Sequence, residues 1–103
     1  MTAWLIIPQM AARIRNTVLA SLVLALMTTA CSNQAQKVFD EAQKFYDLDE
    51  YQKAIDHYTE AIRLDPKHVN AYNMRGVSYN VLGQHKLAIQ DYTEAIRLDP
   101  EYE

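Results

Sequence analysis

Apolar residues beyond position 35 recur at spacings of three and four, which is the pattern of amphipathic helices. Val38, Ala42 and Phe45 form a first set, and a polar break separates them from a second set. The second set consists of Ala54, Ile55, Tyr58, Ala61 and Ile62. Residues three and four positions apart share one face of a helix, so the pattern predicts two helices. Pro66 is expected to end the second helix, because proline lacks the backbone N–H that a helix interior needs.

The polar break, DLDE at positions 47–50, carries a signal for the start of the second helix. Asp49 is followed three residues later by Gln52, and this spacing resembles a capping box. In such a box the two side chains accept hydrogen bonds from backbone N–H groups that the first helical turn leaves unpaired. We therefore expect a new helix to begin at Asp49.

The sequence YTEAIRLDP occurs twice without a change, at positions 58–66 and 92–100. The copies lie 34 residues apart, and the same offset aligns residues 35–68 with residues 69–102. The second segment repeats the layout of the first, with Gly83 at its turn and apolar or small positions at Tyr72, Gly76, Tyr79, Ala88, Ile89, Tyr92, Ala95 and Ile96. With only two glycines and three prolines, the composition favours helices. The chain is therefore predicted to be all-α.

A period of 34 residues with recurrent small and aromatic positions resembles the tetratricopeptide repeat family. The corresponding residues are Ala42 and Gly76, Ala54 and Ala88, Ala61 and Ala95, Phe45 and Tyr79, Tyr58 and Tyr92, and Pro66 and Pro100. Three positions depart from the family pattern: Val38 stands where Trp or Tyr is usual, and Glu41 and Arg75 stand where Leu is usual. The resemblance implies two helix-turn-helix hairpins, residues 35–68 and 69–102, which form a fragment of an α-solenoid.

Residues 1–30 have the order of a secretory signal peptide. Arg13 and Arg15 precede an uncharged run, residues 17–30, that is fourteen residues long and ends in small side chains. A membrane-spanning helix needs about 20 apolar residues, so the length favours a signal core, with an uncleaved anchor as the alternative. Met10 stands directly before the basic residues and is a candidate for the true start of the chain.

The segment TTAC, with Ala30 before Cys31, resembles the lipobox of bacterial lipoproteins, although Thr28 stands where Leu is usual. The resemblance implies that Cys31 receives a diacylglycerol group and becomes the new N-terminus, leaving residues 31–34 as a short tether. Ser32 at the following position is compatible with transfer to an outer membrane. The alternatives are ordinary signal cleavage after Ala30, which would leave a periplasmic protein, and an uncleaved anchor in the inner membrane.

Charge and reactive residue types argue against several classes of function. Without residues 1–30 the formal net charge is −5, compared with −3 for the whole sequence. The sequence therefore offers no basic patch that would bind nucleic acids or anionic lipid surfaces. A single cysteine forms no internal disulfide, and His57, His68 and His85 lack the spacing of a metal motif. The sequence contains no recognisable nucleophile arrangement or glycine-rich phosphate loop. We therefore expect neither enzymatic activity nor a metal or cofactor.

In the tetratricopeptide family the first helix of each hairpin lines a concave groove, which implies a binding surface here. The residues that recur at helical spacing on these helices are Gln36, Phe39, Gln43, Tyr46, Asn70, Asn73, Val77 and Asn80. Amides can donate and accept hydrogen bonds and aromatic rings offer contact area, so an extended peptide is the expected ligand. The alternative is that the amides only solvate an exposed face. Family members that clamp a C-terminal carboxylate use Lys and Arg at places occupied here by Phe39, Asp40, Asn70 and Met74, which disfavours that ligand.

The last predicted helix has an apolar face for which the sequence offers no covering helix. Ile89, Tyr92 and Ile96 are therefore candidates for an association surface. A second copy of the chain, which would give a symmetric homodimer, is the first expectation. A different protein, or residues of a longer chain from which this sequence is truncated, are the alternatives.

Together these patterns predict a noncatalytic adaptor that binds a protein or peptide partner and is tethered by lipid in a bacterial envelope. Two other functions remain as alternatives. One is a self-associating assembly module, and the other is a fragment of a longer tetratricopeptide protein.

Overall fold

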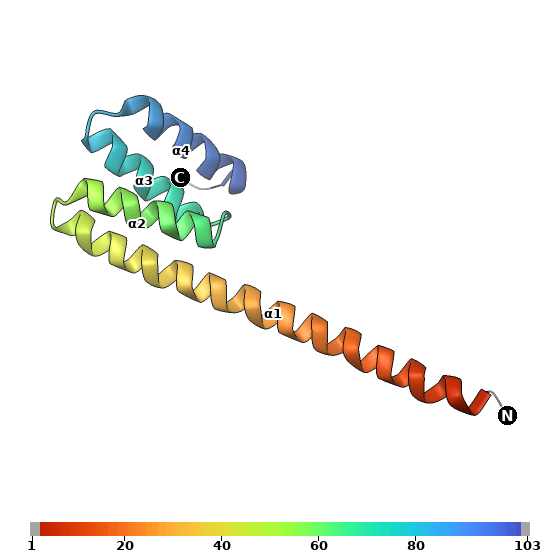
Figure 1. Cartoon of the computed structure of the whole chain (residues 1–103). Helices are drawn as coiled ribbons and strands as arrows, with labels where there is room; N and C mark the ends of the chain where they lie inside the picture. The colour runs from red at the N-terminus through yellow and green to blue at the C-terminus, as the bar shows by residue number, and fades with distance from the viewer. Residues whose placement is uncertain (1–2, 102–103) are drawn as a thin grey trace. The chain divides into compact units, whose positions relative to one another are not determined.

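The computed structural model describes the backbone of residues 3–101 and the side chains of residues 20–101. Over this range the chain forms four α-helices and no strand, which confirms the all-α prediction. Helix α1 comprises Ala3–Asp47, α2 Tyr51–Leu64, α3 Val69–Val81 and α4 His85–Leu98 (Figure 1). The chain divides into two units, Met1–Ala30 and Cys31–Glu103.

The first unit consists of the N-terminal part of α1. The hydroxyl groups of Thr28 and Thr29 both donate to the carbonyl oxygen of Ala25, at 2.8 and 2.9 Å. Such bonds to the preceding turn satisfy a hydroxyl group within a helix. The large apolar side chains described in this unit are exposed: Leu22, Val23, Leu24, Leu26 and Met27. In the part of the chain that the structure describes, no helix offers an apolar stretch of the length that a bilayer crossing requires.

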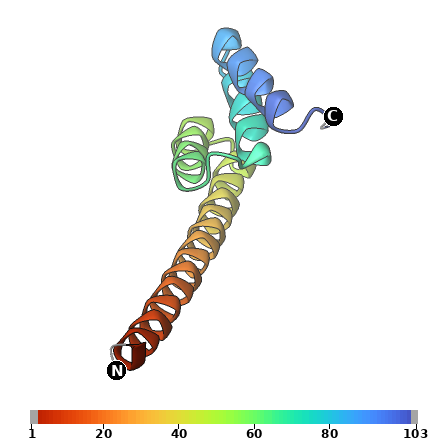
Figure 2. The same cartoon turned by 90° about the vertical axis from the view of Figure 1, so that its right-hand side faces the viewer.

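The second unit consists of two helical hairpins, the first formed by the C-terminal part of α1 with α2 and the second by α3 with α4 (Figures 1 and 2). Residues 31–34, which the sequence assigns to a tether, are helical and belong to α1. Two clusters of buried residues join α1, α2 and α3, and their members are Val38, Ala61 and Ala71 in one and Ala42, Ala54 and Tyr58 in the other. The small alanine side chains let the helix backbones approach closely, as the repeat pattern predicts.

The second hairpin achieves the same close approach with a glycine. A Cβ atom on Gly76 would lie 2.8 Å from Cε1 of Tyr92 and 3.3 Å from the carbonyl oxygen of Ala88. Because 2.8 Å is too short for a contact between carbon atoms, the ring of Tyr92 in this position requires glycine on α3. Ala88 and Ala95 of α4 are also buried.

The expectation that a capping box at Asp49 and Gln52 starts α2 is wrong. The residue that precedes the first turn of α2 is Glu50, and its side chain makes no capping hydrogen bond. Gln52 instead donates from Nε2 to Oδ1 of Asp56 at 3.2 Å, along the surface of α2.

Asp49 belongs to the end of α1 rather than to the start of α2. Its φ of 60° lies in the left-handed region, and its N–H donates to the carbonyl oxygen of Tyr46 at 3.0 Å. The N–H of Glu50 donates to Phe45 at 2.9 Å, and these two bonds together define a Schellman motif. Gly83, with a φ of 77°, holds the same place after α3. Asp49 and Gly83 therefore occupy the same left-handed position, one at the end of α1 and the other at the end of α3.

Candidate functional site

The predicted groove residues of α1 make contacts within the chain, and two of them help to hold the core. Phe39 packs against both buried clusters, with its ring centre 5.5 Å from that of Tyr58. Oε1 of Gln43 accepts a hydrogen bond from the hydroxyl group of Tyr58 at 3.0 Å. Tyr46 packs against the second cluster, and its ring meets that of Tyr51 edge-on at 5.3 Å. Part of the predicted groove is therefore scaffold.

Gln36, the first residue of the predicted groove, connects α1 to the start of α3 through His68. Oε1 of Gln36 lies 3.3 Å from Nε2 of His68, and the imidazole stacks on the ring of Phe39 at 4.9 Å. Nδ1 of the same imidazole accepts from the backbone N–H of Ala71 at 3.2 Å, so His68 caps α3. The tautomer with its hydrogen on Nε2 satisfies both bonds. From the sequence, His68 was considered only as a metal ligand, and this capping role was not predicted.

The predicted groove residues of α3 divide into exposed and half-buried positions. Asn70 and Asn80 are exposed, whereas Asn73 and Val77 are half-buried. Oδ1 of Asn80 lies 2.6 Å from Nδ1 of His85, which ties the end of α3 to the start of α4. The exposed amides of α3 thus lie in a row that begins beside the contact between α1 and His68.

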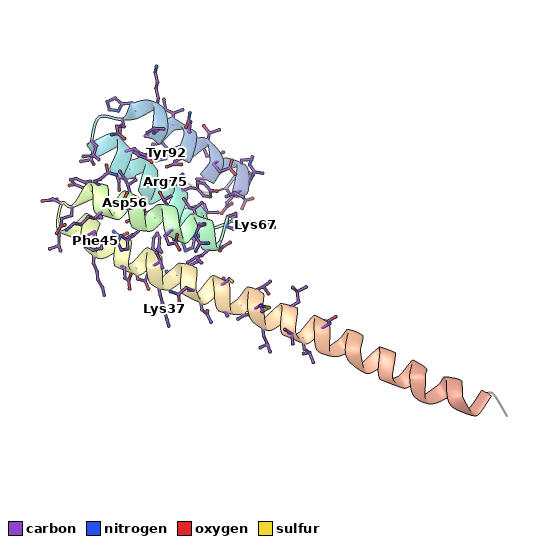
Figure 3. The ribbon with its side chains drawn as sticks, viewed as in Figure 1. Lys37, Phe45, Asp56, Lys67, Arg75 and Tyr92 are labelled. Carbon is purple, nitrogen blue, oxygen red and sulfur yellow. The ribbon has the colours of Figure 1, made fainter. Side chains whose placement is uncertain are left out.

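An ion pair that the sequence reasoning missed joins the two helices of the second hairpin. Arg75 of α3, labelled in Figure 3, donates from Nε and Nη2 to the two carboxylate oxygens of Asp91 on α4, at 2.8 and 2.7 Å. Nη1 of Arg75 also donates to the hydroxyl oxygen of Thr59 on α2 at 3.1 Å. One guanidinium group therefore connects three helices. The signal available in the sequence was the charge of Arg75 at a place where the family usually has Leu.

The surroundings of Arg75 favour its charged form. The side chains of Arg75 and Asp91 are only 17% and 7% exposed. The hydrogen bonds to Asp91 raise the pKa of Arg75 above its usual range, although burial acts in the opposite direction. The rings of Tyr72 and Tyr79 lie within 5.7 and 5.9 Å of the guanidinium carbon, at cation–π distance. Among the described residues, every buried side-chain nitrogen or oxygen has a hydrogen-bond partner.

The first hairpin has no equivalent of this ion pair. The positions that correspond to Arg75 and Asp91 are Glu41 and His57. A hollow of about 260 Å³ lies there, lined by Val38, Glu41, Asp56, His57 and Glu60. His57 instead turns its ring toward Phe45, at 4.7 Å, and its Nδ1 lies 2.9 Å from the carbonyl oxygen of Lys53.

The predicted association residues on α4 differ in exposure. Ile89 is 63% exposed and Ile96 is 54% exposed, while Tyr92 is half-buried against Gly76 within the hairpin. Cys31, the predicted lipidation site, is a free and exposed thiol. In the region that the structure describes, no group of three or more His, Cys, Asp or Glu side chains is arranged to hold a metal ion.

The sequence model of the tetratricopeptide repeat family matches residues 39–103, which is more than half of the chain. This chain therefore belongs to the tetratricopeptide repeat family, and the resemblance inferred from its repeats is confirmed. Repeats of this class stack into extended surfaces that bind other proteins. Residues 39–103 accordingly have the architecture of a protein–protein interaction module.

Two solved structures share this fold. The crystal structure of MamA is similar with a TM-score of 0.63 and 32% identity, covering 64% of this chain and 39% of that chain. The crystal structure of the Sgt2 TPR domain from Aspergillus fumigatus is similar with a TM-score of 0.65 and 33% identity, covering 67% of this chain and 46% of that chain. The matched region thus spans less than half the length of either structure.

Proposed function

We propose that this protein is a noncatalytic adaptor that binds an extended peptide segment of a partner protein along α1 and α3. The observation that carries this proposal is the row of side chains on α3, in which the exposed amides of Asn70 and Asn80 flank the half-buried Val77. An extended peptide backbone needs partners that both donate and accept hydrogen bonds, and side-chain amides do both. Val77 supplies apolar contact area between them.

A selection of displayed random peptides on the full chain tests this proposal. Enriched peptides should bind the wild-type chain and lose at least about tenfold in affinity to the variant Asn70→Ala/Val77→Ala, because truncating central contact residues typically costs more than 1 kcal/mol. Gln52→Ala is the matched control, since Gln52 is exposed on α2, outside this row. If the peptides bind the double variant and the control with equal affinity, the row on α3 is not the peptide-binding site.

We further propose that Cys31 tethers this adaptor to a membrane of a bacterial envelope. The support is the resemblance of residues 28–31 to a lipobox together with the exposure of the thiol. In the modification, the sulfur forms a bond to the glyceryl carbon of a phospholipid, whose head group leaves with the thiol proton. The peptide bond between Ala30 and Cys31 is then hydrolysed. The groove would in this case lie close to the bilayer surface, which favours partners in the envelope.

Intact mass measurement on the membrane fraction of expressing bacteria tests the tether. We expect a species that begins at Cys31 and carries the added mass of a diacylglyceryl group, and we expect Cys31→Ala to abolish it. Ser32→Ala is the control that should leave the modification intact. An unmodified chain cleaved after Ala30, or a chain that retains residues before Ala30, would show that Thr28 prevents recognition of the lipobox.

A further inference from the structure

The two copies of the repeat place the same isoleucine in two different environments. Ile55 on α2 is 3% exposed, whereas Ile89, its equivalent on α4, is 63% exposed. The difference does not come from the residue or from the apolar residues around it, because Ala88, Tyr92 and Ala95 near Ile89 repeat Ala54, Tyr58 and Ala61 near Ile55. It comes from a neighbour: α3 packs on α2, and in the described residues no helix packs on the equivalent side of α4. The face of α4 that contains Ile89 is therefore exposed, whereas the equivalent face of α2 is buried by α3.

This surface is a single stripe along α4. Ile89, Thr93 and Ile96 follow one another at spacings of four and three, so they share one face of the helix. Lys86 precedes Ile89 by three residues, and Asp99 follows Ile96 by three residues. Asp99 is the extended residue that directly follows α4, and its Oδ1 accepts a hydrogen bond from the N–H of Glu101 at 3.2 Å. The stripe therefore has a basic residue in the first turn of α4 and an acidic residue just beyond its last turn.

Stacking of one chain on the next, head to tail, would place α1 of a second copy on this stripe. In α3 the residues that face α2 include Ala71 and Met74, which pack on the buried clusters. The equivalent residues of α1 are Lys37 and Asp40, and both are exposed. Figure 3 shows Lys37 on the side of α1 away from α2. Burying these charges against isoleucine would be unfavourable, so α1 does not offer the required apolar face.

We propose that two copies of this chain pair through α4, with the two helices antiparallel about a twofold axis. In this register Ile89 of one copy faces Ile96 of the other, and Lys86 of one copy faces Asp99 of the other. Twofold symmetry repeats each of these contacts, so two apolar pairs are flanked by two pairs of opposite charge. This inference goes beyond the proposed peptide groove, because it uses a different helix and a different kind of partner.

Sedimentation velocity of the full chain over a range of concentrations, in a mild detergent that keeps the N-terminal segment in solution, tests the pairing. We expect a monomer–dimer equilibrium that Ile89→Lys shifts toward monomer by at least about 100-fold in dissociation constant, because the variant places a charge in an apolar contact twice per dimer. Leu48→Lys is the matched control, since Leu48 is 66% exposed but lies outside α4, and it should leave the dimer unchanged.

A charge exchange tests the register separately. Lys86→Glu places like charges opposite each other twice and should weaken the dimer by about fivefold or more, whereas Lys86→Glu/Asp99→Lys should restore it. Circular dichroism confirms that each variant keeps its helices. A monomer at all concentrations, assemblies that grow beyond the dimer, a dimer that Ile89→Lys leaves intact, or a double charge variant that is not restored would each overturn the proposal.

Discussion

The ion pair between Arg75 and Asp91 makes the sharpest prediction about stability. Arg75→Met removes the guanidinium group but keeps most of the aliphatic length of the side chain. The side chain of Asp91, which is 7% exposed in the wild type, then lacks the two donors that Arg75 provides. A carboxylate in that position loses water on folding and gains no hydrogen bond from Arg75 in return, so the variant should be destabilised.

The magnitude follows from the burial of the pair. Removing one partner of a buried ion pair typically costs about 3–5 kcal/mol, and the 17% exposure of Arg75 places the expected cost near the lower limit, about 3 kcal/mol. A unit of this size has a total stability of about 4–10 kcal/mol. The substitution should therefore remove a large part of the free energy of unfolding. Replacing both charges, as Arg75→Met/Asp91→Leu, should return the stability to within about 1 kcal/mol of wild type, because no buried charge is left unpaired.

Urea unfolding of the full chain, followed by circular dichroism at the helix band, measures these differences. Arg63→Met is the matched control: Arg63 also pairs with a carboxylate, that of Glu60, but both side chains lie largely in water. An exposed pair of this kind contributes little, so we expect no measurable change. Two results would refute the reasoning: equal midpoints for Arg75→Met and Arg63→Met, or a double variant whose loss equals the sum of the two single losses.

The helix termini and the buried tyrosine give two further predictions. Asp49 and Gly83 both have left-handed backbone conformations, which glycine adopts more readily than other residues. Asp49→Gly should therefore stabilise the chain by about 0.5–1 kcal/mol, and Gly83→Ala should destabilise it by about 1 kcal/mol. Equal effects of the two changes in urea unfolding would contradict this. Burial, followed by the nearby charge of Asp47, raises the pKa of Tyr58 well above its usual range. Above pH of about 10 the unfolded chain therefore releases a proton that the folded chain keeps, and stability should fall by up to about 1.4 kcal/mol per pH unit from this residue. Tyr58→Phe should lose about 1 kcal/mol at neutral pH, because its hydroxyl donates to Gln43, yet show a shallower alkaline decline; parallel declines would contradict the assignment.

The helices and their buried faces could be predicted from the sequence because they depend on spacing along one helix at a time. Alanines at positions 42, 54 and 61 are buried where the repeat pattern places them. The ion pair could not be derived in the same way, since Arg75 and Asp91 meet across two helices and their spacing in the sequence follows no helical period. The contact of Arg75 with Thr59 depends in addition on how the second hairpin packs on the first.

The start of α2 was predicted wrongly because one short segment contains two competing signals. Asp49 and Gln52 have the spacing of a capping box, but the end of α1 requires a residue in the left-handed conformation, and Asp49 takes that role. Asp tolerates this conformation better than most residues other than glycine and asparagine. Gly83 at the equivalent position of the second repeat was the available clue. For the groove, spacing selected one face of α1, but it could not show that Phe39 and Gln43 face the core contacts around Tyr58.

Comparison of the two copies of YTEAIRLDP shows which structural features depend on the helix itself and which depend on neighbouring helices. In both copies the glutamate and arginine pair on the surface, at Glu60 with Arg63 and at Glu94 with Arg97, and both helices end at the leucine before the aspartate. These features depend on the helix alone and are therefore identical. The isoleucines of the two copies, Ile62 and Ile96, differ in burial. Their burial depends on the next helix, and only the first copy has α3 beside it. A duplicated sequence with unequal burial thus locates a contact surface more directly than hydrophobicity does, since each repeat serves as the other's control.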